Sequence, residues 1–229
     1  FYRAAQVVIG GGGTGTPAVL ASGTEEQKQF YVHKAIKREI IFCQGYSEPH
    51  CGTDLAGVRC RATRTDTGGE SHYVVKGQKI YTTNAQVSTH IFLLVRTDPD
   101  SRRHAGLSIL LVPMDTPGIT VRPLLTVQNN PGGPAGTTYG EERTNEVFFD
   151  DVKVPASCLL GQEGDGWAVS QRGLNLDRVG AWRYLISVKR DEDIVNWLKS
   201  EDVRAHPLRI DASVRDKVAE LWIEGQVCR

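Results

Sequence analysis

Residues 90–114, "HIFLLVRTDPDSRRHAGLSILLVPM", contain two apolar runs separated by a polar and charged stretch. Apolar runs of this length are typical of strands that are buried on both faces. The nearby segment "VRCRATRT", residues 58–65, alternates instead, with Val, Cys and Ala on one face and Arg and Thr on the other. Because polar turns join such segments at short intervals, the patterns predict an antiparallel β-sandwich or barrel over residues 39–162.

Helical patterns flank this β region on both sides. The segment "TEEQKQFYVHKAIKR" begins at Thr24, a favoured N-cap residue, and carries acidic residues in its first turn. After the β region we expect a long helix from about Asp165 to Lys199, then an amphipathic helix in "DASVRDKVAELWIEGQVCR". This order of elements predicts an α+β protein of several domains, not a doubly wound α/β one. Because the last helix carries an apolar stripe and the chain lacks an initiator Met, we expect an internal portion of a longer protein.

The glycine-rich segment "VVIGGGGTG", residues 7–15, matches the spacing of a dinucleotide-binding fingerprint. That motif works only between a strand and a helix, with an acidic residue at a strand end about 20 positions further on. Here Pro17 follows almost at once, and the acidic candidates Glu25 and Glu26 fall inside the predicted helix. We therefore interpret the segment as a glycine-rich loop between two helices.

The composition excludes several classes of function. Lys plus Arg and Asp plus Glu both total 27, so nothing favours a nucleic-acid or anionic-membrane surface. No apolar run approaches the ~18 residues that a transmembrane helix requires. The histidines lack ligand spacing, and no CxxC pair exists, so neither a metal site nor a disulfide framework is expected. We expect free thiols in a reducing compartment for the five cysteines, Cys43, Cys51, Cys60, Cys158 and Cys228.

Three polar segments interrupt the strand patterns. Residues 42–57, "FCQGYSEPHCGTDLAG", offer hydrogen-bonding side chains among glycines that let the backbone approach a ligand closely. Residues 77–85, "GQKIYTTNA", place a Tyr and two Thr at the end of a strand. Taken alone, both segments are equally well explained as ordinary turns. Residues 126–146, rich in Gly, Pro and Asn, form a long loop that either borders a ligand or is a surface insertion.

Five motifs, taken in order and at their distances, resemble those of the acyl-CoA dehydrogenase family: "FCQGYSEPHCGTDLAG", "YVVKGQKIYTTNA", "FLLVRTDP", "NEVFFDDVKVP" and "GQEGDGW". The resemblance covers nearly the whole chain. It implies an acyl-CoA dehydrogenase-like α+β fold, with the end of an N-terminal helical domain at 1–38 and a central β domain at 39–162. Residues 163–229 would then be the first helices of a truncated C-terminal bundle. The resemblance also implies FAD between the β domain and the helices, with an acyl-CoA thioester against the flavin.

The first polar segment matches the family positions that contact the flavin. Ser47 would donate its hydroxyl to the pyrimidine side of the ring, and Gln44 and Tyr46 would contribute mostly backbone groups. Thr53 stands where the family usually has Ser, and it would reach the cofactor phosphate.

The second polar segment completes the cofactor site that the resemblance implies. Tyr81 stands where many members have Trp, and its ring would pack beside the flavin. Thr83 would bind the ring nitrogen that receives hydride, and Thr82 between them also belongs to the cofactor-binding set.

The substrate side of the site is less complete in this sequence. Asn175 and Arg178 match positions that hold the CoA arm, although the family more often has Asp at the first. Most members place the catalytic Glu beyond the position of residue 229. A minority place it at the position of Asp177, which makes Asp177 a candidate base or else a capping or salt-bridging residue. The family's Arg followed by Phe-Gly after the first bundle helix is missing, so the chain either makes that diphosphate contact differently or pairs with an unlike subunit.

The resemblance implies FAD-dependent α,β-dehydrogenation of an acyl-CoA in fatty-acid, branched-chain or sterol side-chain breakdown. A flavin monooxygenase of the same fold and a non-catalytic subunit of a heteromeric dehydrogenase are the alternatives. The implied partners are an acyl-CoA, an electron-transfer flavoprotein and further subunits of a homo- or hetero-oligomer, a dimer or tetramer. We expect no nucleic acid, no membrane and no metal. The expected location is the cytoplasm, or the mitochondrial matrix in a eukaryote.

Overall fold

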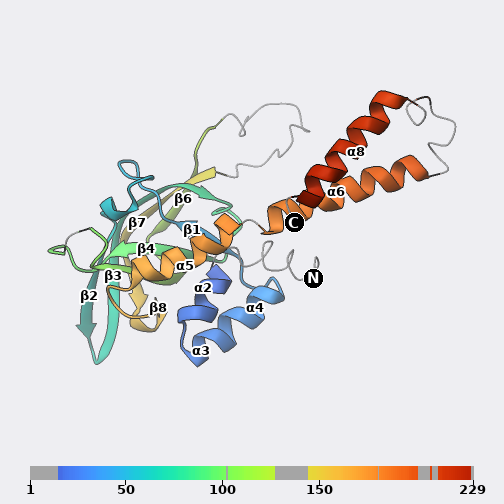
Figure 1. Cartoon of the computed structure of the whole chain (residues 1–229). Helices are drawn as coiled ribbons and strands as arrows, with labels where there is room; N and C mark the ends of the chain where they lie inside the picture. Colours follow the sequence, from blue (N-terminus) through green and yellow to red (C-terminus); the bar gives the residue numbers. More distant parts are fainter. Residues whose placement is uncertain are drawn as a thin grey trace. The chain divides into compact units, whose positions relative to one another are not determined.

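The computed structural model describes residues 15–101, 103–126, 144–179, 181–200, 207 and 211–227, without the side chains of 67, 176–188, 190 and 226. The described residues up to Asp177 form one compact unit, and those from Arg178 onward form a second (Figure 1). The division into three domains that the resemblance implies stays a prediction.

The first unit is built on one sheet of eight strands (Figure 1). The strands are β1 (Phe42–Gly45), β2 (Arg61–Thr67), β3 (Glu70–Thr83), β4 (His90–Arg96), β5 (Leu107–Pro113), β6 (Ile119–Pro123), β7 (Thr144–Pro155) and β8 (Leu159–Leu160). Their order is β6-β7-β3-β2-β4-β5-β8, with β1 also paired to β4. The predicted α+β class is confirmed. Among the described strands the sheet is open and not a closed barrel, because its end strands β6 and β8 do not pair.

Strands β1 and β2 both run parallel to β4, so the sheet is mixed and not purely antiparallel. Their registers follow each other along β4: Gly45 pairs with Leu93, and Arg61 pairs with Arg96. Two strands therefore lie one after the other along the same neighbour. The residues between them, 46–60, leave the sheet and return to it.

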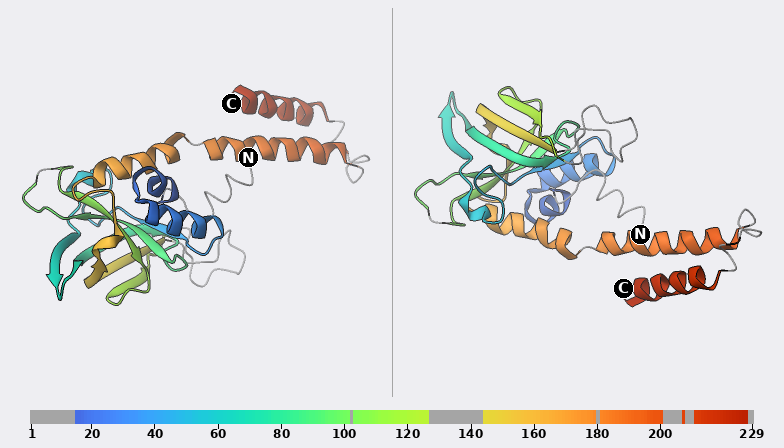
Figure 2. Two further views of the ribbon diagram at one scale, coloured as in Figure 1. Left: turned by 90° about the horizontal axis from the view of Figure 1, so that it is seen from below. Right: turned by 90° about the horizontal axis from the view of Figure 1, so that it is seen from above.

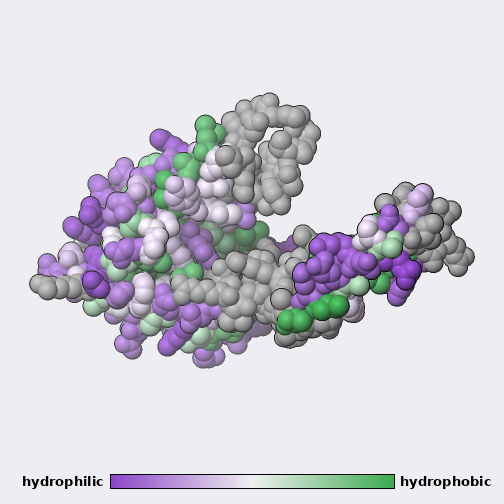
Figure 3. Space-filling model, turned by 45° about the horizontal axis from the view of Figure 1, so that its top comes forward, coloured by the Kyte–Doolittle hydropathy of each residue, from purple (hydrophilic) through white to green (hydrophobic). Residues whose placement is uncertain are grey.

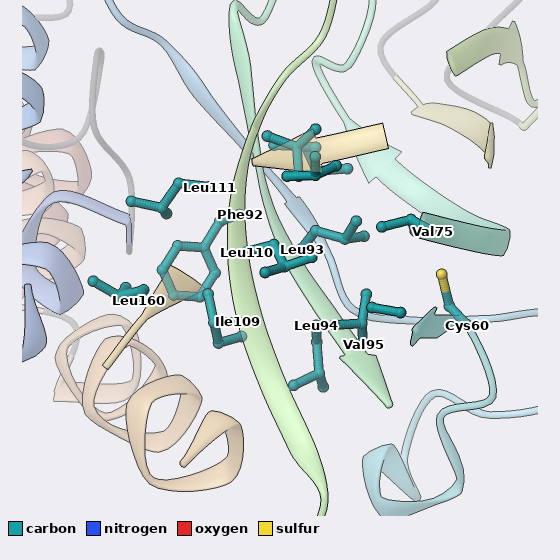
Figure 4. Packing of buried hydrophobic residues seen from close by; sticks show 14 of the residues in the cluster. Cys60, Val75, Phe92, Leu93, Leu94, Val95, Ile109, Leu110, Leu111 and Leu160 are labelled. Carbon is teal, nitrogen blue, oxygen red and sulfur yellow. The ribbon is translucent and has the colours of Figure 1, made fainter. Parts of the chain in front are cut away.

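The core lies on both faces of the β4–β5 pair, as the two apolar runs predict. Residues 91–95 and 107–112 are fully buried. Phe92 points toward Leu160 on one face, whereas Leu93 and Val95 point toward Val75 and Cys60 on the other (Figure 4). The predicted alternation before and along β2 is also confirmed, because Val58, Cys60 and Ala62 are buried, whereas the residues that follow each of them are exposed.

Short helices precede the sheet: α2 (Gly15–Ser22), α3 (Glu25–Gln27), the π-helical turn η2 (Lys28–Val32) and α4 (His33–Ile36). Thr24 forms the predicted N-cap and makes a reciprocal capping box with Gln27. The Gln27 Nε2 also donates to the carbonyl oxygens of Ser157 and Leu159 at 2.9 and 2.8 Å. These bonds attach the helices to the sheet. Gly10 and Gly12 of the fingerprint spacing lie outside the described residues.

The helical region after the sheet contains α5 (Gly166–Val179), α6 (Ala181–Lys199) and α8 (Ala212–Val227). The single helix predicted over 165–199 is thus described as two helices, α5 and α6. In the second unit, α6 and α8 lie side by side and antiparallel (Figure 2). Apolar surface borders strongly polar surface on this helix pair (Figure 3), and Trp197, Trp222 and Ile223 are among its exposed side chains. No described helix is long and apolar enough to cross a membrane.

Candidate functional site

The polar segment 46–60 leaves the sheet directly after Gly45. A Cβ at Gly45 would lie 2.7 Å from Ile91 Cδ1 and 2.9 Å from Leu93 Cδ1, so β1 packs against β4 more closely than another residue would permit. Leu55–Gly57 form a single 3₁₀ turn, η3, before the chain reaches β2. The segment therefore projects from a closely packed part of the sheet.

A tight turn at residues 48–51 lies near the start of the segment 46–60. The backbone amide of Glu48 donates to the carbonyl oxygen of Cys51 at 2.7 Å, and the Cys51 amide donates back to Glu48 at 3.0 Å. The buried Glu48 carboxylate accepts hydrogen bonds from the backbone amides of Arg59 at 2.8 Å and Cys60 at 2.9 Å. Glu48 thus connects the start of the segment 46–60 to its end.

Lys79 on β3 joins the two polar segments. Its side chain is fully buried, and its ammonium lies 2.7 Å from Glu48 Oε1. The same ammonium donates to the carbonyl oxygen of Tyr46 at 3.1 Å, and the neighbouring Ile80 amide donates to the carbonyl oxygen of Ser47 at 2.9 Å. The structure therefore brings the segments 42–57 and 77–85 side by side.

The sequence interpretation did not identify the Glu48–Lys79 pair. A signal was present, because Lys79 continues the inward-facing series that Tyr73 and Val75 begin at every second position of β3. A lysine in such a register is rarely buried unless it is paired. That rule predicts a buried carboxylate opposite it.

Several hydroxyls in the paired segments are available to a ligand. Ser47 is half-buried, and Thr53 and Thr83 are exposed. Within the described part of the chain, none of these three hydroxyls has a hydrogen-bond partner. A Cβ at Gly52 would lie 3.7 Å from Ser47 Oγ, so the backbone just before Thr53 passes close to Ser47.

Tyr81 is turned outward by an irregularity of β3. The β3–β7 register shifts between Lys79 and Thr82, and Tyr81 adopts φ 57°. A bulge of this kind redirects a side chain at the end of a ladder. Tyr81 is 64% exposed as a result, so it presents an aromatic side chain at the end of the second polar segment.

The remaining cofactor candidates differ in burial. Tyr46 is buried with its ring 6.0 Å from that of Phe92, so its side chain belongs to the core. Thr82 is also fully buried, and its Oγ1 has no hydrogen-bond partner among the described residues. Gln44 is half-buried on β1.

The substrate candidates lie on α5. Asn175 is exposed, and among the described residues its side chain makes no hydrogen bond to either polar segment. Asp177 and Arg178 occupy the last turn of α5, but their side chains lie outside the described residues. Of the loop 126–146, residues 127–143 also lie outside them.

One group of side chains has the composition of a metal site. Ligand atoms of Glu48, His50 and Cys51 lie within 4.8 Å of one another. The Lys79 ammonium already supplies a positive charge to Glu48. Burial is the main cause that raises the pKa of the Cys51 thiol, which favours the protonated, non-ligating form.

The described cysteines are free thiols, as predicted. Burial raises the pKa of Cys43 to about 12 and that of Cys60 to about 11. These thiols are therefore protonated at neutral pH. Cys228 lies outside the described residues.

Comparison with known proteins assigns this fold to a class. Residues 43–152 match the family description "Acyl-CoA dehydrogenase, middle domain". The chain is 34% identical over 221 residues to acyl-CoA dehydrogenase IpdE1 of Mycolicibacterium smegmatis, covering 93% of this chain and 52% of that protein.

Solved structures agree. The Tcur3481–Tcur3483 steroid ACAD, G363A variant, superposes with a TM-score of 0.76 at 30% identity, over 96% of this chain and 53% of that one. The ChsE4–ChsE5 complex of Mycobacterium tuberculosis superposes with a TM-score of 0.67 at 30% identity, over 97% of this chain and 53% of that one. The chain belongs to the acyl-CoA dehydrogenase family, whose members are FAD flavoproteins. It spans about half the length of the relatives it matches.

Proposed function

We propose that the whole protein is an FAD-dependent dehydrogenase that oxidises the α,β bond of an acyl-CoA thioester. The observation that carries the proposal is the pairing of segments 42–57 and 77–85 through the Ile80–Ser47 hydrogen bond. This pairing gathers unpartnered hydroxyls and an exposed aromatic ring in a member of a flavoprotein family.

The donor chemistry of the paired segments fits a flavin. The isoalloxazine presents mainly carbonyl and ring-nitrogen acceptors, and the Ser47 and Thr83 hydroxyls are donors without another described partner. Tyr81 offers an aromatic face. We propose that these three side chains hold the ring, that Thr53 binds the phosphate, and that Gln44, Tyr46 and Thr82 line the site. When bound, FAD would accept the β-hydrogen as hydride.

Removal of the α-proton requires a carboxylate base. Thioester α-protons are weakly acidic, so the base needs a dry environment and the thioester carbonyl needs hydrogen-bond donors. We propose Asp177 as the base that this chain can supply, with Asn175 and Arg178 binding the CoA arm. Since a Glu beyond residue 229 is the competing candidate, the assignment needs a direct test.

Asp177→Asn in the full-length protein tests that assignment. We expect the rate of flavin reduction by acyl-CoA to fall by at least about a hundredfold, with flavin binding unchanged. Asp216→Asn on the exposed face of α8 is the matched control. An unchanged rate in the Asp177 variant would assign the base to another residue.

A heteromeric enzyme is the second candidate. Three of the matched structures carry paired names, two of them Tcur3481–Tcur3483 and one the ChsE4–ChsE5 complex. The missing Phe-Gly after the first bundle helix also favours a partner that completes the diphosphate contact. We propose acyl-CoA thioesters, including those formed on the side chain of a sterol, as the substrate class. Electron transfer to a flavoprotein and a cytoplasmic location stay predictions.

The experiment is an absorption spectrum of the full-length protein, repeated without oxygen after addition of straight-chain, branched and steroid side-chain acyl-CoAs. Bleaching of the flavin band by one thioester would support the dehydrogenase and define its substrate. A flavin that stays oxidised with every thioester would favour the monooxygenase. Flavin that appears only after co-expression with an unlike chain would favour the heteromer.

A further inference from the structure

We propose that the buried Glu48–Lys79 ion pair is a positioning pair. It fixes the position of the Tyr46–Ser47 backbone relative to β3 so that Ser47 can bind the flavin. The inference rests on the proposed function. Neither side chain is placed among the groups that contact the cofactor. Both act through the backbone of the residues that do.

The Glu48 carboxylate is saturated with partners. Its Oε1 receives the Lys79 ammonium at 2.7 Å and the Cys60 amide at 2.9 Å. Its Oε2 receives the Arg59 amide at 2.8 Å and has His50 Nε2 at 3.4 Å. The carboxylate side chain is only 3% exposed, so water cannot replace a lost partner easily.

Lys79 connects the Glu48 carboxylate to the backbone of the segment that we propose binds the flavin. Its ammonium donates to the Tyr46 carbonyl oxygen at 3.1 Å, and the next residue, Ile80, donates its amide to Ser47 at 2.9 Å. Two consecutive residues of β3 thus hold two consecutive carbonyls of the loop. The half-buried Ser47 hydroxyl is attached to that doubly held backbone.

Stability alone does not explain a buried ion pair at this position. Well-packed apolar residues often stabilise a fold as well as such a pair does. An apolar pair could not bind the Tyr46 carbonyl or the Arg59 and Cys60 amides. What the ion pair adds is a defined geometry for a backbone that passes from β1 to β2 outside the sheet.

The test uses the full-length protein, with its unlike partner if one is required. Lys79→Met removes the ammonium at similar length, and Lys76→Met on the same strand is the control, because Lys76 is 67% exposed. We expect Lys79→Met to weaken FAD binding by about tenfold or more and to shift the visible flavin bands. The control should leave both unchanged.

Glu48→Gln and Lys79→Gln keep the test usable if Lys79→Met does not fold. Each retains side-chain volume and some hydrogen bonding while removing one charge. Glu48→Gln combined with Lys79→Gln should weaken FAD binding no more than the stronger single variant, since both remove the same pair. Additive losses would show that the two residues act separately and would overturn the proposal.

Two further outcomes separate this inference from the proposed function. If the wild-type protein binds FAD and the folded variants bind it equally, with unchanged bands and only a lower melting temperature, the pair is merely structural and the inference is wrong. If the wild-type protein, alone and with its partner, binds no flavin, the proposed function fails and the inference falls with it.

Discussion

The backbone amide of Ile80 donates a hydrogen bond to the carbonyl oxygen of Ser47 at 2.9 Å. This bond joins the end of β3 to the segment that leaves the sheet after β1. One residue earlier on each side, Lys79 donates to Tyr46. The candidate site thus lies where two consecutive residues of a strand hold two consecutive residues of a loop.

The Ser47 hydroxyl should contribute to flavin affinity. We expect Ser47→Ala to weaken FAD binding by about two- to tenfold, the effect of one neutral hydrogen bond. Titration of the apoprotein with FAD, followed by flavin fluorescence, measures this change. Ser157→Ala, at an exposed serine away from the paired segments, is the control. Equal affinity of the two variants would remove Ser47 from the cofactor site.

Gln27 should stabilise the attachment of the helices to the sheet. Gln27→Ala removes the acceptor of the Thr24 backbone amide, which is one of the two capping-box bonds, and leaves the carbonyls of Ser157 and Leu159 without their donor. We expect the free energy of unfolding to fall by about 2 kcal/mol or more. Urea unfolding of the full-length protein measures it, with the exposed Gln29→Ala as control. Similar losses in both variants would contradict this role.

Gly166 begins α5 in direct contact with β5, where no side chain fits. A Cβ there would lie 2.5 Å from the backbone nitrogen of Ser108. We expect Gly166→Ala to lower the free energy of unfolding by about 1–3 kcal/mol. Gly52→Ala, whose Cβ would meet nothing closer than Ser47 Oγ at 3.7 Å, should change stability by less than about 0.5 kcal/mol. Thermal unfolding of both variants tests the difference.

The buried Cys43 thiol should make stability depend on alkaline pH. Burial raises its pKa from 9.0 to about 12 in the folded protein. Because the folded-state pKa is the higher one, the contribution is complete below pH 9.0 and is lost as the pH rises toward about 12. Urea midpoints measured across this range should decline less steeply in Cys43→Ala than in the wild type. Parallel curves would assign the decline to other groups, such as the buried Tyr31 and Tyr73.

Local patterns in the sequence determined much of the fold. Unbroken apolar runs predicted the doubly buried β4 and β5, and alternation predicted the buried face that includes Cys60 and Ala62, because side-chain direction in a strand follows from position alone. Thr24 predicted a helix start because an N-cap bonds to residues within one turn. The order of the five motifs was sufficient to predict the family and to name candidate residues for flavin contact.

Only the tertiary structure decided how these parts meet. The parallel pairing of β1 and β2 with β4, and the open sheet, depend on contacts between distant segments that no local periodicity records. Glu48 and Lys79 lie 31 positions apart, and each has an ordinary polar appearance in its own segment. Their pairing exists because folding removes both charges from water, and a buried charge is tolerated only with an opposite partner and saturated hydrogen bonds.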